Sequence, residues 1–370
     1  MVDKIKKYFN SFDFDIRKTK NARFLDQKVT PDILTIISDC VVEFLNQTGQ
    51  NKFTSKDIWN FQYSNENIQE IFNKPNVSDK KAQNEYDKVF QQPLKALSYA
   101  QILYEEKIGN RIFFSVKNRE ILEYVAIRER NALVFLQIYL EKVLQDSDIW
   151  HIFNNFFHFQ TKDSFNLLKR EYENFIIANT AINGTTEVRR IFTKVLNPLA
   201  FKYKKFGTRK GYISTTPITL DELYYNRVNW RDTEKSKNET RQEFTLSNEI
   251  ENKSIAYHKY SLQKAKKLIK KYHSPSSEVK DDFAYGEATQ VHHIFMKSEF
   301  PTIDSYLENL ILLTPTQHFT KAHPQNNTNI IDIEYQKICL EAKYQSIQKF
   351  PDLYSLEDFE YVMKIGYRRN

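Results

Sequence analysis

The stretch EATQVHHIFMKSEFPTIDSYLENLILLTPTQHFTKAHP, residues 287–324, decides how the C-terminal part of the chain folds. Its apolar-flanked His292–His293 pair predicts one strand, Leu310–Thr314 a second strand, and Pro315–His323 the start of a helix. Four of the chain's eight histidines and the loop residue Asn309 lie in this stretch. A strand–loop–strand–helix order can direct imidazoles from a strand and a helix toward one point, so we expect a chemical site here.

Composition favours a folded, mainly helical α+β protein. The chain has 370 residues, of which 41% are hydrophobic and 14% aromatic. This length suffices for two or three domains with separate cores. The seven glycines are few, which argues against Gly-rich phosphate-binding loops and favours helices.

The charge points weakly to a polyanionic partner. A net charge of +7 attracts nucleic acid, although a moderately basic protein without such a partner is the plainer alternative. Cys40 and Cys339 are isolated in the sequence, so we expect two buried thiols rather than a disulfide framework or a structural zinc site. The sequence contains no run of eighteen apolar residues, so we expect a cytoplasmic protein with no membrane partner.

Residues 1–118 are predicted to form a basic arm followed by a DNA-binding module. The arm, residues 1–30, could follow a phosphate backbone or be a solvated lead-in. Beyond it, helical patterns begin at Pro31, at Thr54 and in residues 78–103, where Pro93 predicts a break or kink. Two strand-like runs then flank Gly109–Asn110, a hairpin signal. Three helices closed by a hairpin resemble a winged helix.

In a winged helix the third helix reads the major groove, so its polar residues become candidate DNA contacts. A helical protein-interaction module with a solvated polar face is the alternative. The candidates on the helix and the wing are Lys88, Gln91, Gln92, Lys95 and Arg111.

Two further segments precede the C-terminal unit. Residues 119–200 predict a helical block that connects the ends of the chain and could dimerise. Residues 201–285 are basic, with a predicted hairpin and a helix at 257–272 that contains six lysines and no acid. The candidate DNA contacts of this segment are Lys205, Arg209, Lys210, Arg227, Arg231, Lys266, Lys267 and Lys270.

The site in residues 286–370 suits phosphodiester hydrolysis. That reaction needs a cation on the phosphate oxygens and a base for the attacking water, and histidine is suited to be the base. Adjacent side chains on a strand point to opposite faces, so His292 and His293 should divide these roles. The base must be held in one tautomer, which an asparagine carbonyl accepting from its other ring nitrogen would do.

The residues VHHIFMKSEF…ENLILLTPTQHFTKAH resemble the HNH, or ββα-metal, nuclease family. The resemblance implies that His293 is the general base, that Asn309 positions it, and that His292 and His318 bind the metal. Two features depart from the family pattern. The paired Cys-x-x-Cys of many members is missing, so no structural zinc is expected, and His323 lies five residues after His318 rather than four. We therefore consider His323 and Lys321 as candidate phosphate contacts, with a helix-end role as the alternative for His323.

The whole chain is similar to HNH-type type II restriction endonucleases with a winged-helix-like module. That similarity implies sequence-specific cleavage of double-stranded DNA to 5′-phosphate ends, with Mg²⁺ or another divalent cation such as Mn²⁺. It also implies a homodimer, because one HNH unit cuts one strand, and a cognate methyltransferase that is not a stable subunit. The alternatives are a modification-dependent or other phage-defence HNH nuclease, and a non-catalytic winged-helix DNA-binding regulator.

Overall fold

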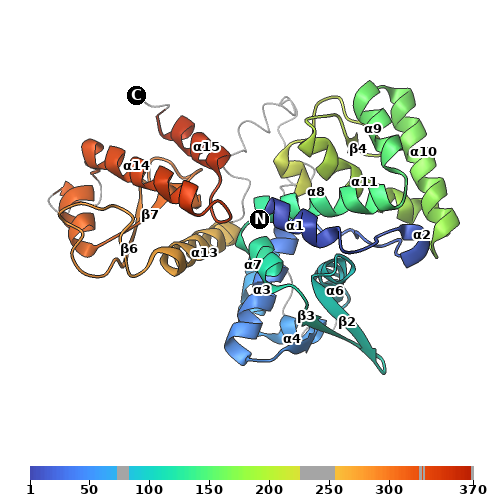
Figure 1. Ribbon diagram of the computed structural model, residues 1–370, viewed down its shortest axis with the longest axis horizontal. Coiled ribbons are helices and arrows are strands. Elements are labelled where there is room, and N and C mark those ends of the chain that lie inside the picture. The colour runs from blue at the N-terminus through green and yellow to red at the C-terminus, as the bar shows by residue number, and fades with distance from the viewer. Residues whose placement is uncertain (73–82, 226–254, 325–326, 328–329, 368–370) are drawn as a thin grey trace, which may run out of the picture. The chain divides into compact units, whose positions relative to one another are not determined.

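The computed structural model describes residues 1–72, 83–225, 255–324, 327 and 330–367, and the chain forms two compact units, Met1–Arg227 and Val228–Asn370 (Figure 1). Most of the described chain is helical, with small antiparallel sheets, so the predicted mainly helical α+β class is confirmed. The predicted DNA contacts Arg227 and Arg231 lie outside the described residues. Among those described, no helix is long and apolar enough to cross a membrane.

The first unit is built around helix α3 (Pro31–Thr48), which begins with a proline at its first turn as predicted. Every residue from 31 to 44 is buried, as expected for a helix that neighbours cover on all sides. Helices α7 (Arg119–Ile127) and α8 (Glu129–Asp146) pack against α3. The predicted segments 1–118 and 119–200 therefore share one core.

Two helices of this unit differ from the sequence prediction. Helix α6 (Gln83–Tyr99) continues through Pro93, where a break or kink was predicted, and Pro93 and Leu94 are buried. The helical block predicted for residues 119–200 begins with two helices, because the extended backbone of Arg128 separates α7 from α8. The remaining helices described in this unit are α1 (Val2–Phe9), α2 (Ile16–Thr19), α4 (Ser55–Asn60), α5 (Gln62–Phe72), α9 (Trp150–Phe159), α10 (Lys162–Asn179), α11 (Thr185–Lys202) and the 3₁₀ helix η1 (Leu220–Leu223).

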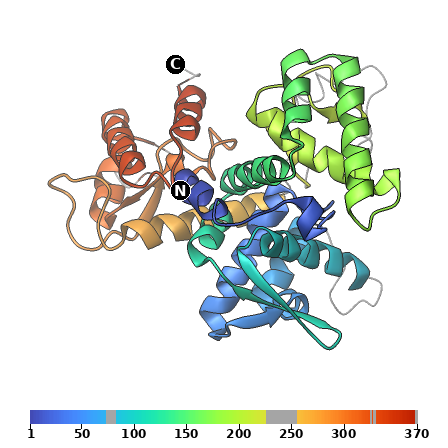
Figure 2. The same ribbon diagram turned by 45° about the vertical axis from the view of Figure 1, so that its right-hand side comes forward.

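The predicted hairpin is confirmed by strands β2 (Leu103–Ile108) and β3 (Arg111–Val116). Gly109 has φ +60°, which a residue with a side chain rarely adopts. Strand β1 (Lys52–Thr54) pairs with β3, so the sheet order is β1-β3-β2. Figure 2 shows the β2–β3 hairpin projecting beyond the helices beside it. A second, two-residue hairpin consists of β4 (Thr208–Arg209) and β5 (Tyr212–Ile213).

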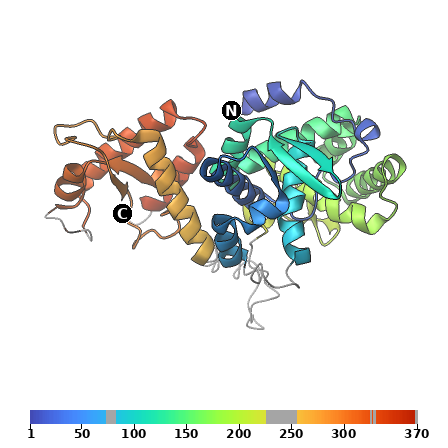
Figure 3. The same ribbon diagram turned by 90° about the horizontal axis from the view of Figure 1, so that it is seen from below.

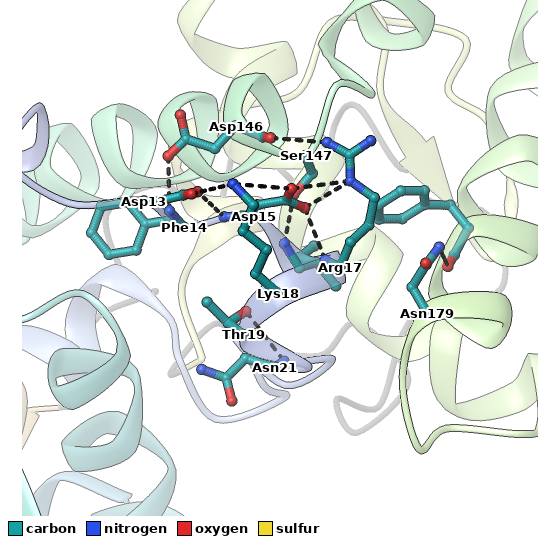
Figure 4. A network of polar contacts seen from close by, with 12 residues as sticks. Asp13, Phe14, Asp15, Arg17, Lys18, Thr19, Asn21, Asp146, Ser147 and Asn179 are labelled. Atoms are coloured by element: carbon teal, nitrogen blue, oxygen red, sulfur yellow. Dashed lines mark hydrogen bonds and ion pairs between the residues drawn. The ribbon is translucent and has the colours of Figure 1, made fainter.

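The basic N-terminal arm is folded and docked rather than extended (Figure 4). The Phe14 amide donates to the carboxylate of Asp146 at 2.8 Å, and the Ile16 amide donates to the Ser147 hydroxyl at 3.0 Å. The Arg17 guanidinium pairs with the buried Asp15 at 2.9 Å. The arm thus contacts the C-terminal end of α8, and several of its positive charges pair with acidic residues of the protein.

The second unit places a short two-stranded sheet among helices. Figure 3 shows helix α13 (Ile255–His273) lying along strands β6 (Gln290–His293) and β7 (Leu310–Leu313). Strand β7 is buried at all four positions and pairs antiparallel with β6. The other elements described are the 3₁₀ turn η2 (Leu307–Asn309), the π-helix η3 (Gln317–Ala322), α14 (Ile333–Lys349) and α15 (Leu356–Gly366).

A buried ion pair ties the sheet of this unit to α14. Lys343 Nζ lies 2.6 Å from Glu278 Oε2, and both side chains are fully buried. The other carboxylate oxygen of Glu278 accepts from the Leu312 amide of β7 at 2.8 Å. His273, at the end of α13, hydrogen-bonds to the Tyr354 hydroxyl at 2.7 Å, and that hydroxyl also accepts from Lys343. This network fixes the elements that carry the histidine cluster.

Candidate metal centre and the adjoining histidine

The two adjacent histidines of β6 lie in different surroundings, as their positions on a strand predict. In the register of the sheet His292 faces Ile311 and His293 faces Leu310. His292 is 3% exposed and contacts the rings of His318 and His323. Burial, followed by those neighbouring imidazoles, lowers the pKa of His292 well below its ordinary value. His292 is therefore neutral at pH 7.

A π-helix explains the five-residue spacing between His318 and His323. The His323 amide donates to the His318 carbonyl at 3.1 Å, the i→i+5 hydrogen bond that defines a π turn. In an α-helix residues four apart lie on one face, whereas the wider turn brings residues five apart together. The predicted helix after β7 is thus present in π form over Gln317–Ala322, and it brings His323 back toward His318.

Three imidazoles meet at this point. The ring centroids of His292 and His318 are 5.3 Å apart, and each lies 4.8 Å from the ring centroid of His323. The three ring planes are close to perpendicular to one another. One ligand nitrogen from each ring falls within 4.8 Å of the others. His323, which the sequence suggested as a phosphate contact or a helix-end residue, instead completes a three-histidine cluster.

The cluster presents lone pairs rather than protons. The Ile330 carbonyl can only accept, so the 2.9 Å contact means that His323 donates from Nδ1 and keeps Nε2 for a ligand. Burial, with a smaller effect of the neighbouring His323, lowers the pKa of His318 to about 4. In the described structure the buried Nδ1 of His318 has no hydrogen-bond partner. The neutral rings of His292 and His318, together with the unpaired buried nitrogen, fit a metal cation, which would supply the missing partner.

The donor set bears on the identity of the metal. Three imidazole nitrogens suit first-row transition ions such as Zn²⁺, Ni²⁺ or Co²⁺, whereas Mg²⁺ prefers oxygen ligands. Three protein ligands also leave coordination positions for water or substrate, as in catalytic zinc sites. The residues thus fit a divalent metal, and they fit a transition ion better than the Mg²⁺ predicted from the sequence.

His293 is arranged to accept a proton. It hydrogen-bonds to the backbone of Asp304, and its Nε2 is buried and unpartnered among the described residues. Burial, together with Lys266 and Lys297, lowers the pKa of His293 to about 4, although Asp304 acts in the opposite direction. The ring is neutral at pH 7, with the tautomer fixed through Nδ1 and a lone pair on Nε2.

Asn309 hydrogen-bonds to the backbone of the loop, whereas the sequence suggested a hydrogen bond to the ring of His293. Its side-chain oxygen accepts from the Phe295 amide at 2.8 Å. Its amide donates to the carbonyls of Phe295 and Ile303 at 3.1 and 3.2 Å. Asn309 is fully buried and thereby closes the loop between β6 and β7 on itself. Because Asp304 follows Ile303, this closure fixes the backbone that contacts His293.

The other predicted contacts of this unit are divided between two places. Lys266 lies on α13 near enough to His293 to act on it electrostatically. Lys267 and Lys270 are exposed on the same helix. Lys321, a candidate phosphate contact, lies with its ammonium 4.0 Å above the ring of Phe283. The structure thus brings Lys266 to the site and gives Lys321 a cation–π contact within the protein.

Three predicted contacts of the first unit, Arg209, Gln92 and Lys95, have partners within the protein. The Arg209 guanidinium binds both oxygens of Glu222 and the carbonyls of Thr216 and Pro217, so it clamps the β4–β5 hairpin. The remaining candidates differ in exposure: Lys88, Arg111 and Lys210 are exposed, Lys205 and Gln91 are half-buried, Gln92 accepts from the Lys28 amide, and Lys95 pairs with Glu105.

Sequence reasoning missed three residues beside the site. Asp304 is fully buried, and its carboxylate contacts His258 at 2.9 Å and Lys297 at 3.6 Å. Lys297 lies within VHHIFMKSEF and Asp304 within residues 287–324, but neither stands at a position to which the resemblance assigns a role. The one sequence feature that points to this contact is the absence of acidic residues from the helix that carries His258. An acidic partner of His258 must therefore come from another segment.

No family model, no curated protein and no solved structure matches the chain. The function of the histidine cluster must therefore be inferred from its own geometry and chemistry.

Proposed function

We propose that the protein is a metal-dependent endonuclease of the HNH type that cleaves double-stranded DNA. One observation carries the proposal. The three-histidine cluster lies next to the neutral His293, because His292 and His293 are consecutive residues of one strand. The Nε2 lone pair of His293 has no partner among the described residues. A cation site next to a proton acceptor is the pairing that phosphodiester hydrolysis requires.

His293 takes the proton from the attacking water in this proposal. The Asp304 backbone holds its Nδ1 side, so the accepting nitrogen is Nε2. Asn309 keeps that backbone in place through its hydrogen bonds to Phe295 and Ile303. When bound at His292, His318 and His323, a divalent cation would stabilise negative charge on the phosphate oxygens.

DNA is the proposed substrate because basic surface accompanies the site. Helix α13 bears exposed lysines, and Lys266 lies close to His293. In the first unit, α3, α4 and α6 with the β1-β3-β2 sheet support the proposal of a winged-helix-like module. Within such a module, the exposed Lys88 and Arg111 are the proposed readers.

We further propose a type II restriction-like activity that leaves 5′-phosphate ends. A single site cuts one strand, so cleavage of both strands needs two copies, most simply in a homodimer. A cognate methyltransferase that protects the recognition sequence would act separately. The metal in this proposal is a transition ion, because its ligands are imidazoles; Mg²⁺, with Mn²⁺ as its substitute, remains the prediction from the resemblance.

The test is digestion of unmethylated and methylated plasmid by purified protein, with Zn²⁺, Mn²⁺, Mg²⁺ or EDTA. Discrete fragments that require metal and His293, judged beside His293→Ala, support restriction. Cleavage of modified DNA alone would favour a modification-dependent nuclease. Binding without cleavage in every metal would favour the non-catalytic regulator and would overturn the proposal.

A further inference from the structure

Beside His293, on the side of α13, the second unit gathers basic groups around one buried acid. We propose that His258, Lys266 and Lys297 form a binding subsite for a phosphate of the DNA backbone. Asp304 is the positioning residue that holds the basic side chains of this subsite in place. The inference rests on the proposed function, because it places the DNA strand next to the proposed base. None of these four residues belongs to the three-histidine cluster.

Asp304 organises the subsite from a fully buried position. Its Oδ2 contacts His258 Nε2 at 2.9 Å and Lys297 Nζ at 3.6 Å. Its Oδ1 is buried with no hydrogen-bond partner in the described part of the chain. The same residue holds His293 through its backbone. One residue of the loop therefore fixes His293 and two basic groups from different segments.

The basic groups reach solvent although their anchor does not. The side chains of His258 and Lys297 are 28% and 54% exposed, whereas that of Asp304 is 0% exposed. His258 contacts the carboxylate through Nε2, which leaves Nδ1 on the other side of the ring. Each group can therefore contact an external ligand while staying tied to the loop.

The charge balance selects the chemistry of that ligand. Lys297 Nζ lies 3.6 Å from the Asp304 carboxylate, and Lys266 brings a second positive charge near enough to act on His293. One carboxylate cannot neutralise two ammonium groups, and a third basic group, His258, adjoins it. An anion would complete the balance, and a phosphate oxygen accepts from ammonium and imidazole N–H groups alike. The DNA backbone supplies such phosphates at regular intervals along a strand.

The salt dependence of DNA binding tests the subsite without requiring cleavage. A fluorescent duplex is titrated with full-length protein in EDTA at several salt concentrations, and log Kd is plotted against log salt. Each phosphate contact contributes about 0.9 to the slope. We expect Lys266→Ala and Lys297→Ala each to lower the slope by about 0.9 and the double variant by about twice that amount. His258→Ala should weaken binding as well.

Lys364→Ala is the matched control, because it removes one charge from an exposed lysine of α15. It should retain the wild-type slope. Unchanged slopes in all the subsite variants would overturn the inference, and so would an equal decrease in Lys364→Ala, since the effect would then be general. Thermal melts identify variants that are misfolded, and the exposed Lys297 gives a variant in which misfolding is not expected.

The two proposals fail in different ways. Altered slopes in a protein that cleaves no plasmid in any metal would refute the nuclease and support the phosphate subsite. Metal-dependent cleavage by the wild type, combined with wild-type slopes in the variants, would refute the subsite and support the nuclease.

Discussion

Replacing Asn309 with alanine should loosen the loop that holds His293. The side chain makes three buried hydrogen bonds, at 2.8, 3.1 and 3.2 Å, to Phe295 and Ile303. Each buried backbone group left unpaired costs about 1–3 kcal/mol. Three such groups, with partial relaxation of the loop, predict a loss of about 3–5 kcal/mol in local stability. That loss raises the equilibrium constant for opening of the loop by roughly a hundredfold or more.

Hydrogen exchange followed by mass spectrometry measures this opening in peptides that cover residues 290–313. We expect these amides to lose protection in Asn309→Ala, and we expect the variant to lose DNA cleavage as well. Asn131→Ala, which removes a buried asparagine of α8 in the first unit, is the matched control and should leave the peptides unchanged. Full protection combined with lost cleavage would refute the reasoning, because Asn309 would then act on the His293 ring directly.

Three other predictions concern metal binding, pH and the buried ion pair. Calorimetry should show one Zn²⁺ bound per chain in the wild type. The affinity of His318→Ala for Zn²⁺ should fall by more than the roughly 10- to 100-fold that a supporting contact contributes. Equal affinities of the wild type and the variant would exclude the histidine cluster as a metal site. Burial lowers the pKa of His273 to about 4, below the 6.5 of the unfolded chain, so its contribution is fully present above pH 6.5 and is lost as the pH falls toward 4. Urea unfolding between pH 7 and 4 should reveal up to about 3 kcal/mol of such loss, and a stability that is flat across this range would contradict it. Lys343→Ala should destabilise by about 3–5 kcal/mol because it leaves Glu278 buried and unpaired, whereas the exposed Lys337→Ala should keep the wild-type melting temperature.

Local patterns predicted much of the fold because they are enforced by local physics. Gly109–Asn110 marks the β2–β3 turn, since few residues adopt its positive φ. Pro31 begins α3, and the two apolar runs around the His292–His293 pair and Leu310 form the β6–β7 sheet. The acid-free stretch at 257–272 forms α13. Each of these signals lies within one element and needs no knowledge of its neighbours.

Features that depend on tertiary contacts could not be predicted in the same way. The π turn that joins His323 to His318 depends on the packing of the segment after β7, and the sequence spacing alone suggested a phosphate contact or a helix-end residue at His323. The direct contact expected between Asn309 and His293 is replaced by closure of the loop. Arg209 lies in a basic segment of the kind that contacts DNA, but its guanidinium instead pairs with Glu222, which follows the hairpin.

The plasmid-cleavage rate of metal-loaded His293→Ala tests the central claim most directly. His293 lies beside the three-histidine cluster but is not part of it, so the variant should bind metal with wild-type stoichiometry. General-base catalysis contributes roughly 10²–10⁴-fold, so cleavage should slow by at least about 100-fold. Wild-type cleavage by the metal-loaded variant would contradict the role of His293, and a wild-type protein that cleaves no DNA in any metal would contradict the nuclease itself.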